Sequence, residues 1–415
     1  MHKKRIAVIG AGPSGMMASI RAANLSGQVT LFEKNPFPGK KLLLSGKGRC
    51  NITNACDLSL FLARFSGNGE FLRDAFQRFF YPELVRFFQE RGLKFKIERQ
   101  SRVFPVTDSS SSVLGVLKRE LSASNVEVLY NTPVRDIIAE GSKVGGVITQ
   151  SGARVPFDAV ILATGGVSYP FTGSTGEGLK IAEDKGHSIT PLRPGLIALK
   201  VKEKYCRILE GLTLKNIRLK FKSKKKDIAS EVGEMVFTSD GISGPLVLSL
   251  SGRVIDLLDK KIDVCVAINL KPGLSTEQLD NRLLRDFRDN PKKDIRNIMK
   301  DLLPLKLVGL FLSLLKIDPR QKGNQVTLEA RREIVNLLTD WRLDITGSGP
   351  IREAMVTRGG ISLKEINPRT MESRVIKGLY FCGEIMDIDA DTGGFNLQAA
   401  FSTGYLAGEC AARAM

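Results

Sequence analysis

The residues with the clearest chemistry are three glycines near the start of the chain. Gly10, Gly12 and Gly15 form a G-x-G-x-x-G pattern directly after the apolar run at residues 6–9. The first glycine permits a tight turn, the second lets a pyrophosphate approach the backbone, and the third lets a helix pack closely on a strand. A helical run begins near Ser14, and free N–H groups there would face the phosphates. The pattern therefore predicts a dinucleotide site.

An acidic residue stands at the position expected for ribose recognition. A second apolar run occupies residues 29–32, and Glu33 follows it, eighteen residues after Gly15. A carboxylate at the end of a second strand can accept hydrogen bonds from a ribose 2′-OH. The alternative is a structural glycine turn with a surface glutamate. The order of strand, turn, helix, strand and carboxylate favours the dinucleotide site.

Cys50 is a candidate for the acid that would supply a proton in a catalysed reaction. It lies in a segment where Gly46 and Gly48 permit close approach to a ligand and Arg49 can meet a phosphate. A thiol near its usual pKa of ~8.5 is protonated at neutral pH and can give up that proton. Two alternatives stay open: Cys50 as a small buried residue of a cofactor loop, and the whole segment as a plain basic loop.

The composition argues against several other classes of protein. The six cysteines are scattered without a C-x-x-C pair and there are only two histidines, so we expect no zinc site, disulfide framework or multi-histidine metal site. Asp387, Asp389 and Asp391 alternate, but the spacing lacks the glycine and distal glutamate of a calcium loop. No apolar stretch approaches the ~18 residues of a membrane span. The first residues run straight into a strand without a signal-peptide core, so we expect a cytoplasmic protein.

Four regions must position these residues. Residues 1–190 combine buried strands, glycine turns and helices, which predicts the first part of an α/β, Rossmann-like domain. Residues 191–272 alternate short apolar runs with turns and predict an inserted β-rich domain. Residues 273–336 predict a small inserted helical domain. Residues 337–415 return to glycine-rich loops and a final helix, which completes the first domain.

A stripe of phenylalanines between residues 70 and 92 predicts an amphipathic helical segment. Arg73, Arg78, Arg86 and Arg91 are interleaved with the aromatic residues. A stripe at helical spacing is more often core than a stacking surface. We therefore interpret it as core.

The formal charge of the chain is +18 at pH 7, with 62 Lys and Arg against 44 Asp and Glu. Basic residues gather in both predicted insertions, at residues 200–226 and 282–300. Such a field attracts polyanions, phosphate backbones above all, so we favour a nucleic-acid partner over a merely solvated basic surface. Residues 214–221 mix apolar and basic side chains, which predicts one largely cationic strand face.

Taken together, these residues resemble the BaiN/YhiN-like family of FAD-dependent oxidoreductases, also described as NAD(P)/FAD-dependent. The resemblance extends over nearly the whole chain. It rests on the following motifs: the glycine pattern with Glu33-Lys34, the Arg-Cys-Asn-Ile-Thr-Asn run at 49–54, Ala-Thr-Gly-Gly at 163–166, the segment 238–245 ending Gly-Ile-Ser-Gly-Pro, Thr-Arg-Gly-Gly at 357–360, and residues 380–398.

The resemblance implies a Rossmann-like fold of the glutathione-reductase type, with FAD at the first glycine pattern. It places Gly383 and Glu384 at the ribityl and pyrophosphate region, and Asn396 and Leu397 at the isoalloxazine edge. Carried over position by position, the cofactor contacts are Gly10, Gly12, Ser14, Gly15, Glu33, Lys34, Lys41, Gly48, Arg49, Asn51, Val134, Thr164, Gly165, Gly383, Glu384, Gly394, Phe395, Asn396 and Leu397. Since the sequence has no second G-x-G-x-x-G, NAD(P)H is expected only as a transient electron donor.

Members of this family differ in substrate. Some are similar to ribosomal RNA dihydrouridine synthases, which reduce the C5=C6 bond of a uridine in 23S RNA. Others are similar to reductases of steroid-type enones in bile acid metabolism, or to aminoacetone oxidases. The positive charge favours ribosomal RNA, because a small neutral enone needs no cationic surface. A flavin-stabilised RNA-binding factor without catalysis is a further alternative. Many relatives carry a histidine where Ser239 and Asp240 stand here, which leaves any chemical role of that histidine open.

Overall fold

The computed structural model describes residues 3–413, which divide into two compact units. Unit 1 contains the chain up to Gly195 and from Pro350 onward, and unit 2 is Leu196–Gly349. The β-rich and helical insertions therefore belong to one unit. The expected return at residue 337 precedes the observed one, because β17 (Trp341–Ser348) pairs with strands of unit 2.

Unit 1 is organised around a five-stranded parallel sheet with the strand order β19-β10-β1-β2-β6. These strands are β1 (Arg5–Ile9), β2 (Gln28–Phe32), β6 (Glu127–Leu129), β10 (Ala159–Leu162) and β19 (Leu379–Phe381). All of β10 and β19 and nearly all of β1 and β2 are buried. This explains the uninterrupted apolar runs, since parallel strands are covered on both faces.

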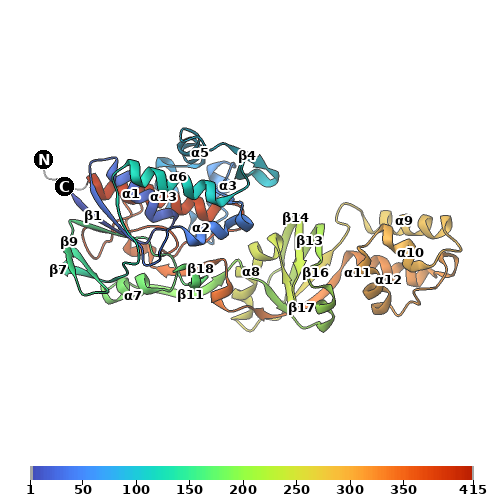
Figure 1. The fold of residues 1–415 in the computed structure, drawn as a ribbon. Helices are drawn as coiled ribbons and strands as arrows, with labels where there is room; N and C mark the ends of the chain where they lie inside the picture. Colours follow the sequence, from blue (N-terminus) through green and yellow to red (C-terminus); the bar gives the residue numbers. More distant parts are fainter. Residues whose placement is uncertain (1–2, 414–415) are drawn as a thin grey trace. The chain divides into compact units, whose positions relative to one another are not determined.

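Two helices from opposite ends of the chain pack side by side beside this sheet (Figure 1). They are α1 (Pro13–Ala23) and α13 (Phe395–Arg413). A Cβ atom at Gly404 would lie 2.2 Å from the carbonyl oxygen of Ser14, and one at Gly408 would lie 2.3 Å from that of Ala18. The absence of side chains at both glycines therefore lets the two helices approach closely.

Smaller elements complete unit 1. Its other helices are α2 (Lys40–Leu44), α3 (Leu58–Leu62), α4 (Arg73–Arg78), α5 (Tyr81–Gln89), α6 (Ser110–Ala123) and α7 (Glu177–Asp184). Three antiparallel sheets join β3 (Thr53–Asn54), β5 (Arg102–Pro105) and β4 (Phe95–Glu98); β7 (Val134–Glu140), β8 (Lys143–Thr149) and β9 (Arg154–Pro156); and β11 (Ile189–Gly195) and β18 (Val356–Ile361).

The helical segment expected at residues 70–92 is divided into α4 and α5. The division falls at Phe79 and Phe80, where the backbone leaves the helical conformation, and Pro82 lies in the first turn of α5. Phe76, Phe79 and Phe88 are buried, so the interpretation of this stripe as core holds for them.

Unit 2 is a closed antiparallel barrel with helices (Figure 1). Its strand order is β12-β15-β14-β13-β16-β17, and the buried Trp341 packs against Phe237 and Phe311. The remaining elements are β12 (Leu199–Val201), β13 (Thr213–Ser223), β14 (Ile228–Phe237), β15 (Gly241–Ser243), β16 (Val264–Asn269), α8 (Pro245–Leu258), α9 (Thr276–Asp289), α10 (Ile295–Ile298), α11 (Leu305–Leu314) and α12 (Leu328–Thr339). Within residues 3–413, no helix has the length and apolar character to cross a bilayer.

Candidate functional site

The three glycines of the turn between β1 and α1 have different surroundings and therefore different roles. A Cβ atom at Gly10, where φ is +103°, would lie 2.7 Å from the carbonyl oxygen of Ala163, and one at Gly15 would lie 1.9 Å from that of Gly10. Both positions are therefore closed by the protein's own backbone. A Cβ atom at Gly12 would meet no atom within 4 Å. Gly12 is also the N-cap of α1 and has no side chain to cap it, so open space adjoins the free N–H groups at the helix start.

Glu33, at the end of β2, lies against this turn. It is buried, and its Oε2 accepts a hydrogen bond from the backbone N–H of Ala11 at 2.9 Å. Its Oε1 accepts from the backbone N–H and the side-chain Nδ2 of Asn35 at 2.8 and 2.7 Å. The predicted ribose carboxylate and the glycine turn are thus brought together. Lys34 contributes elsewhere, because its Nζ donates to Thr175 and pairs with Glu177.

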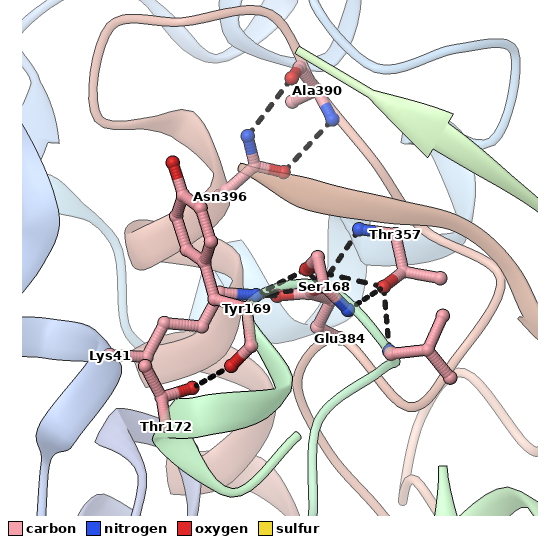
Figure 2. Close-up of polar contacts among 9 residues, drawn as sticks. Lys41, Ser168, Tyr169, Thr172, Thr357, Glu384, Ala390 and Asn396 are labelled. Atoms are coloured by element: carbon pink, nitrogen blue, oxygen red, sulfur yellow. Dashed lines mark hydrogen bonds and ion pairs between the residues drawn. The ribbon is translucent and has the colours of Figure 1, made fainter. Parts of the chain in front are cut away.

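A polar network joins helix α2, the start of β18 and the loops that follow β10 and β19 (Figure 2). Lys41 Nζ lies 2.7 and 2.9 Å from the two carboxylate oxygens of Glu384 and 2.6 Å from Ser168 Oγ. Ser168 Oγ and the Thr357 backbone N–H each donate to Glu384 Oε1 at 2.8 Å. Thr357 Oγ1 accepts from the backbone N–H groups of Val167 and Ser168 at 2.8 and 3.1 Å. The charge of Glu384 is therefore matched by a cation and two neutral donors.

Two residues of this network were not among the predicted contacts. Ser168 follows the Ala-Thr-Gly-Gly run at 163–166, and Thr357 begins the Thr-Arg-Gly-Gly run. Each lies within two residues of a motif already recognised or inside one. Neither serine nor threonine has a spacing that marks it, so only the position beside a glycine turn could have drawn attention to them.

The segment before α13 is tied to the strand β3. A Cβ atom at Gly394 would lie 2.4 Å from the backbone carbonyl of Thr53, and Thr53 Oγ1 donates to Gln398 Oε1 at 2.6 Å. Phe395 is buried, and Leu397 is partly buried against the same core. The structure thus joins the regions around residues 50 and 395, which are far apart in the sequence.

The side-chain amide of Asn396 forms hydrogen bonds with the backbone of the loop before α13. Its Oδ1 accepts from the backbone N–H of Ala390 at 3.0 Å, and its Nδ2 donates to the carbonyl of Ala390 at 2.9 Å (Figure 2). These two bonds fix the loop that precedes α13. Asn396 therefore shapes this loop, whereas its predicted contact with the isoalloxazine edge stays a prediction.

Arg49 does not have a free charge for a phosphate. Glu98 and Asp108 both pair with its guanidinium, whose carbon lies 4.2 Å above the ring of Phe104. Hydrogen bonds to these carboxylates raise the pKa of Arg49, and the bond from Arg49 lowers the pKa of Glu98. Hydrogen bonds from Lys96 and then Arg49 lower the pKa of Asp108. This double pairing argues against the predicted role of Arg49 as a phosphate ligand.

Cys50 is enclosed. It has no exposed surface, and burial raises the pKa of its thiol to about 12 despite a hydrogen bond from Ser45 that acts the other way. Its backbone has a φ of +62°, and its N–H donates to the carbonyl of Ser45 at 3.0 Å. A buried thiol that holds its proton so firmly is a poor acid. The structure therefore favours the alternative, in which Cys50 is a buried residue that shapes the loop.

Several predicted contacts fit a dinucleotide. Asn51 Oδ1 and Thr164 Oγ1 are buried and have no hydrogen-bond partner within residues 3–413. Because an unpaired buried polar atom is costly, both atoms point to a group that the chain does not itself supply. A Cβ atom at Gly48 would meet nothing within 4 Å, as at Gly12. Unfilled space and unpaired acceptors thus occur among the predicted cofactor residues.

The other predicted residues lie around the strand ends of unit 1. A Cβ atom at Gly383, just after β19, would lie 2.6 Å from Ser14 Oγ, so this loop contacts the start of α1. Gly165 follows β10 with a φ of +75°, and the buried Val134 begins β7. The parallel sheet, the glycine turn and the carboxylate at the end of β2 together define a Rossmann-like, FAD-binding type of fold.

Comparison with known proteins identifies the family. The model described as HI0933-like protein Rossmann domain matches residues 4–410, and the chain belongs to this family. It is 33% identical over 411 residues to the 3-dehydro-bile acid delta(4,6)-reductase of Clostridium scindens, covering 98% of this chain and 99% of the relative. It is 30% identical over 409 residues to the ribosomal RNA dihydrouridine synthase of Escherichia coli, covering 96% and 95%.

A solved structure supports the same fold. The 3-ketosteroid delta1-dehydrogenase of Sterolibacterium denitrificans is similar over 100% of both chains, with a TM-score of 0.56 and 13% identity. The expected Rossmann-like fold and family are confirmed. The family consists of FAD-dependent oxidoreductases, and the present chain is an enzyme of this kind.

Proposed function

We propose that this enzyme reduces a carbon–carbon double bond conjugated to a carbonyl, and that its substrate is a uridine of 23S ribosomal RNA, which becomes dihydrouridine. The names of both curated relatives describe products with a saturated bond next to a carbonyl. When bound, FAD supplies the hydride for such a reduction. One alkene carbon gains this hydride, the neighbouring carbon gains a proton, and NAD(P)H is the proposed transient source of the two electrons.

The residues of unit 1 would hold the cofactor. The N–H groups at the start of α1 would face the pyrophosphate beside Gly12, and Glu33 would accept from a ribose hydroxyl. Asn51 Oδ1 and Thr164 Oγ1 would gain the partners that they lack. The Lys41–Glu384 network would keep the surrounding loops in place without leaving a net charge there.

The observation that carries the choice of RNA is the outer face of β13 in unit 2. Along this strand Leu214, Ile217, Leu219 and Phe221 are buried, whereas the side chains between them face outward. The outward residues include Lys215, Arg218 and Lys220, which are exposed. This is the cationic strand face expected from the sequence.

The charge continues past the end of β13 and through unit 2. Residues 224–226 are three exposed lysines in the turn to β14, and unit 2 contains 29 Lys and Arg against 20 Asp and Glu. Lys220 is offset by Asp227 at 2.8 Å, and Lys222 by Asp340 at 2.9 Å. The surplus suits phosphodiesters, which release counterions on binding, and offers nothing to a small neutral enone.

The test is a strain that lacks the gene. Mass spectrometry of its 23S RNA should show that dihydrouridine is lost, and the wild-type gene should restore it. The purified enzyme, reduced without oxygen, should be re-oxidised by RNA from the deletion strain but not by fully modified RNA from the parent. An unchanged dihydrouridine content in the deletion strain rejects this substrate.

A second candidate is the reduction of a small enone. It is favoured by the 33% identity to the bile-acid reductase, which extends over 98% of this chain. In that case a 3-oxo-4-ene steroid should re-oxidise the reduced flavin without RNA. The rate should also be indifferent to salt, because no polyanion takes part.

A further inference from the structure

A groove on unit 1, outside the cofactor site, combines aromatic rings with arginines. It encloses about 260 Å³ between the second half of α1, the end of α4, helix α5 and one residue of α13. Its aromatic residues are Phe79, Phe87 and Tyr405. We refer to it below as the arginine groove. We propose that the arginine groove binds single-stranded RNA next to the modified uridine, an inference that rests on the proposed function.

The groove contains guanidinium planes supported by aromatic rings. The rings of Phe79 and Tyr405 stack with centroids 4.4 Å apart and an interplanar angle of 5°. The guanidinium carbon of Arg21 lies 4.4 Å from the centroid of the Tyr405 ring, and that of Arg91 lies 3.9 Å from Phe87. Unpaired bases stack on aromatic rings and on arginine planes alike. Because Phe79 and Arg21 cover the Tyr405 ring and Arg91 covers Phe87, the flat surfaces that the groove offers a base are the partly exposed guanidinium planes of Arg21 and Arg91.

Two of its four arginines are neutralised within the protein. Arg21 pairs with Glu409 at 2.6 Å, and Arg91 pairs with Glu120 at 2.6 Å. Two carboxylates also line the groove and keep their charge, because Glu83 accepts from the neutral backbone N–H of Phe80 and Glu90 lies 3.7 Å from Arg91, which already pairs with Glu120. These pairs fix the floor of the groove but leave it with little net charge.

Arg78 and Arg86 supply the remaining charge. Both are exposed, and neither forms an ion pair or side-chain hydrogen bond with any residue of the described range 3–413. Two exposed guanidiniums without an ion pair can each donate to a phosphate of a strand whose bases stack nearby. An apolar peptide would instead have to desolvate both charges, which is costly. The combination of two exposed, unpaired guanidiniums with guanidinium planes on which bases can stack, rather than the net charge, favours single-stranded nucleic acid as the occupant.

Helix α1 links the arginine groove to the cofactor site. Its start carries the glycine turn, and Ile20 and Arg21 near its end line the groove. Eleven residues of α-helix extend over about 16 Å. A short single strand can span this length. A uridine extracted from its stack for reduction would leave flanking nucleotides unstacked and able to reach the groove.

The test measures RNA affinity of the FAD-loaded enzyme as a function of salt. The probe is a fluorescein-labelled single-stranded fragment of 23S RNA, followed by anisotropy. The test variant is Arg78→Gln/Arg86→Gln. The matched control is Arg119→Gln/Arg154→Gln, which removes two exposed arginines of unit 1 outside the groove. Flavin absorbance and melting temperature establish that both variants are folded and loaded.

The groove variant should lose about tenfold in affinity at physiological salt, and its plot of log K against log salt should flatten by about 1.4, or ~0.7 for each phosphate contact. The control should match the wild type. If both variants lose affinity equally, or if neither does, the groove is not the binding site, although the proposed function stands. If the wild-type enzyme binds no RNA, the groove proposal and the proposed RNA substrate fail together.

Discussion

The cofactor region of unit 1 and the outer face of β13 in unit 2 both contain cations. In the first region the cation is paired within the protein, whereas on β13 the cations are exposed. Lys41 is partly buried and bonds to Glu384 and Ser168. Lys215 and Arg218 are exposed on a strand whose other face is buried. A resident group needs a preformed, neutralised shell, whereas a polyanion needs charge that the protein has left unpaired. The difference is the one expected between a site for a cofactor and the RNA-binding surface that we propose.

The largest effect is expected from the addition of one methyl group to the glycine turn of the cofactor region. Gly15→Ala places a Cβ atom 1.9 Å from the carbonyl oxygen of Gly10, so the backbone must move. We expect a loss of roughly 3 kcal/mol or more in the free energy of unfolding and a colourless protein after purification. Chemical denaturation and the ratio of flavin to protein absorbance measure the two effects.

Gly12→Ala is the matched control, because open space adjoins Gly12 and its φ of −77° suits alanine. The melting temperature of the apoprotein should stay within about 2 °C of the wild type, while FAD affinity falls at least about tenfold, since the methyl group occupies the approach of the pyrophosphate. Equal effects of the two substitutions on the apoprotein would contradict the separate roles assigned to these glycines.

The neutralised shell is tested by removing its cation. Lys41→Met leaves Glu384 with only the hydrogen bonds from Ser168 and Thr357. A partly buried carboxylate without its cation should cost about 1–3 kcal/mol of unfolding free energy, measured by denaturant titration. The double variant Lys41→Met/Glu384→Gln should recover part of this loss. A loss that is the same in the single and double variants would show that the pairing of charge is unimportant there.

How far the sequence predicts this molecule depends on whether a residue acts locally or across the fold. The glycine turn and Glu33 could be predicted because strand, turn and carboxylate follow one another within 30 residues. The alternation from Ile217 to Phe221 could also be predicted, since it repeats every two residues, but the irregularity at Lys215 and Asn216 could not. Ser168 and Thr357 could not, because 189 positions separate them and only the fold brings their side chains together.

Charge partners were the weakest part of the prediction. Arg49 stands beside glycines and an amide, a setting that predicts a phosphate ligand. In the fold, however, Glu98 and Asp108 from distant segments pair with its guanidinium and neutralise its charge. The burial of Cys50 could not be predicted either, because it depends on all the segments that pack around this residue. The stripe at residues 70–92 served both as core and as the floor of the arginine groove, a dual use that periodicity cannot distinguish.

The unpaired surface of unit 2 is tested by removing two of its charges. Lys215→Gln/Arg218→Gln should flatten the salt dependence of RNA binding by about 1.4 and weaken binding by about tenfold at physiological salt. Reduction of the flavin by NAD(P)H should not change. Lys260→Gln/Lys261→Gln, two exposed lysines of unit 2 after α8, is the matched control. Unchanged RNA binding in the β13 variant would show that the exposed cations of β13 do not contact RNA. The argument for an RNA substrate would then fail.

The smallest effect is expected at Cys50. Burial raises the pKa of its thiol to about 12, so the thiol stays neutral between pH 7 and 10 and neither donates a proton nor changes charge there. Cys50→Ser should alter the rate of flavin re-oxidation by substrate less than about threefold, with no change in the shape of the pH profile. Iodoacetamide should modify Cys50 only after unfolding, as followed by peptide mass spectrometry. A loss of 100-fold or more in a variant that keeps its FAD would instead identify Cys50 as the acid, and would mean that the loop around it opens when substrate binds.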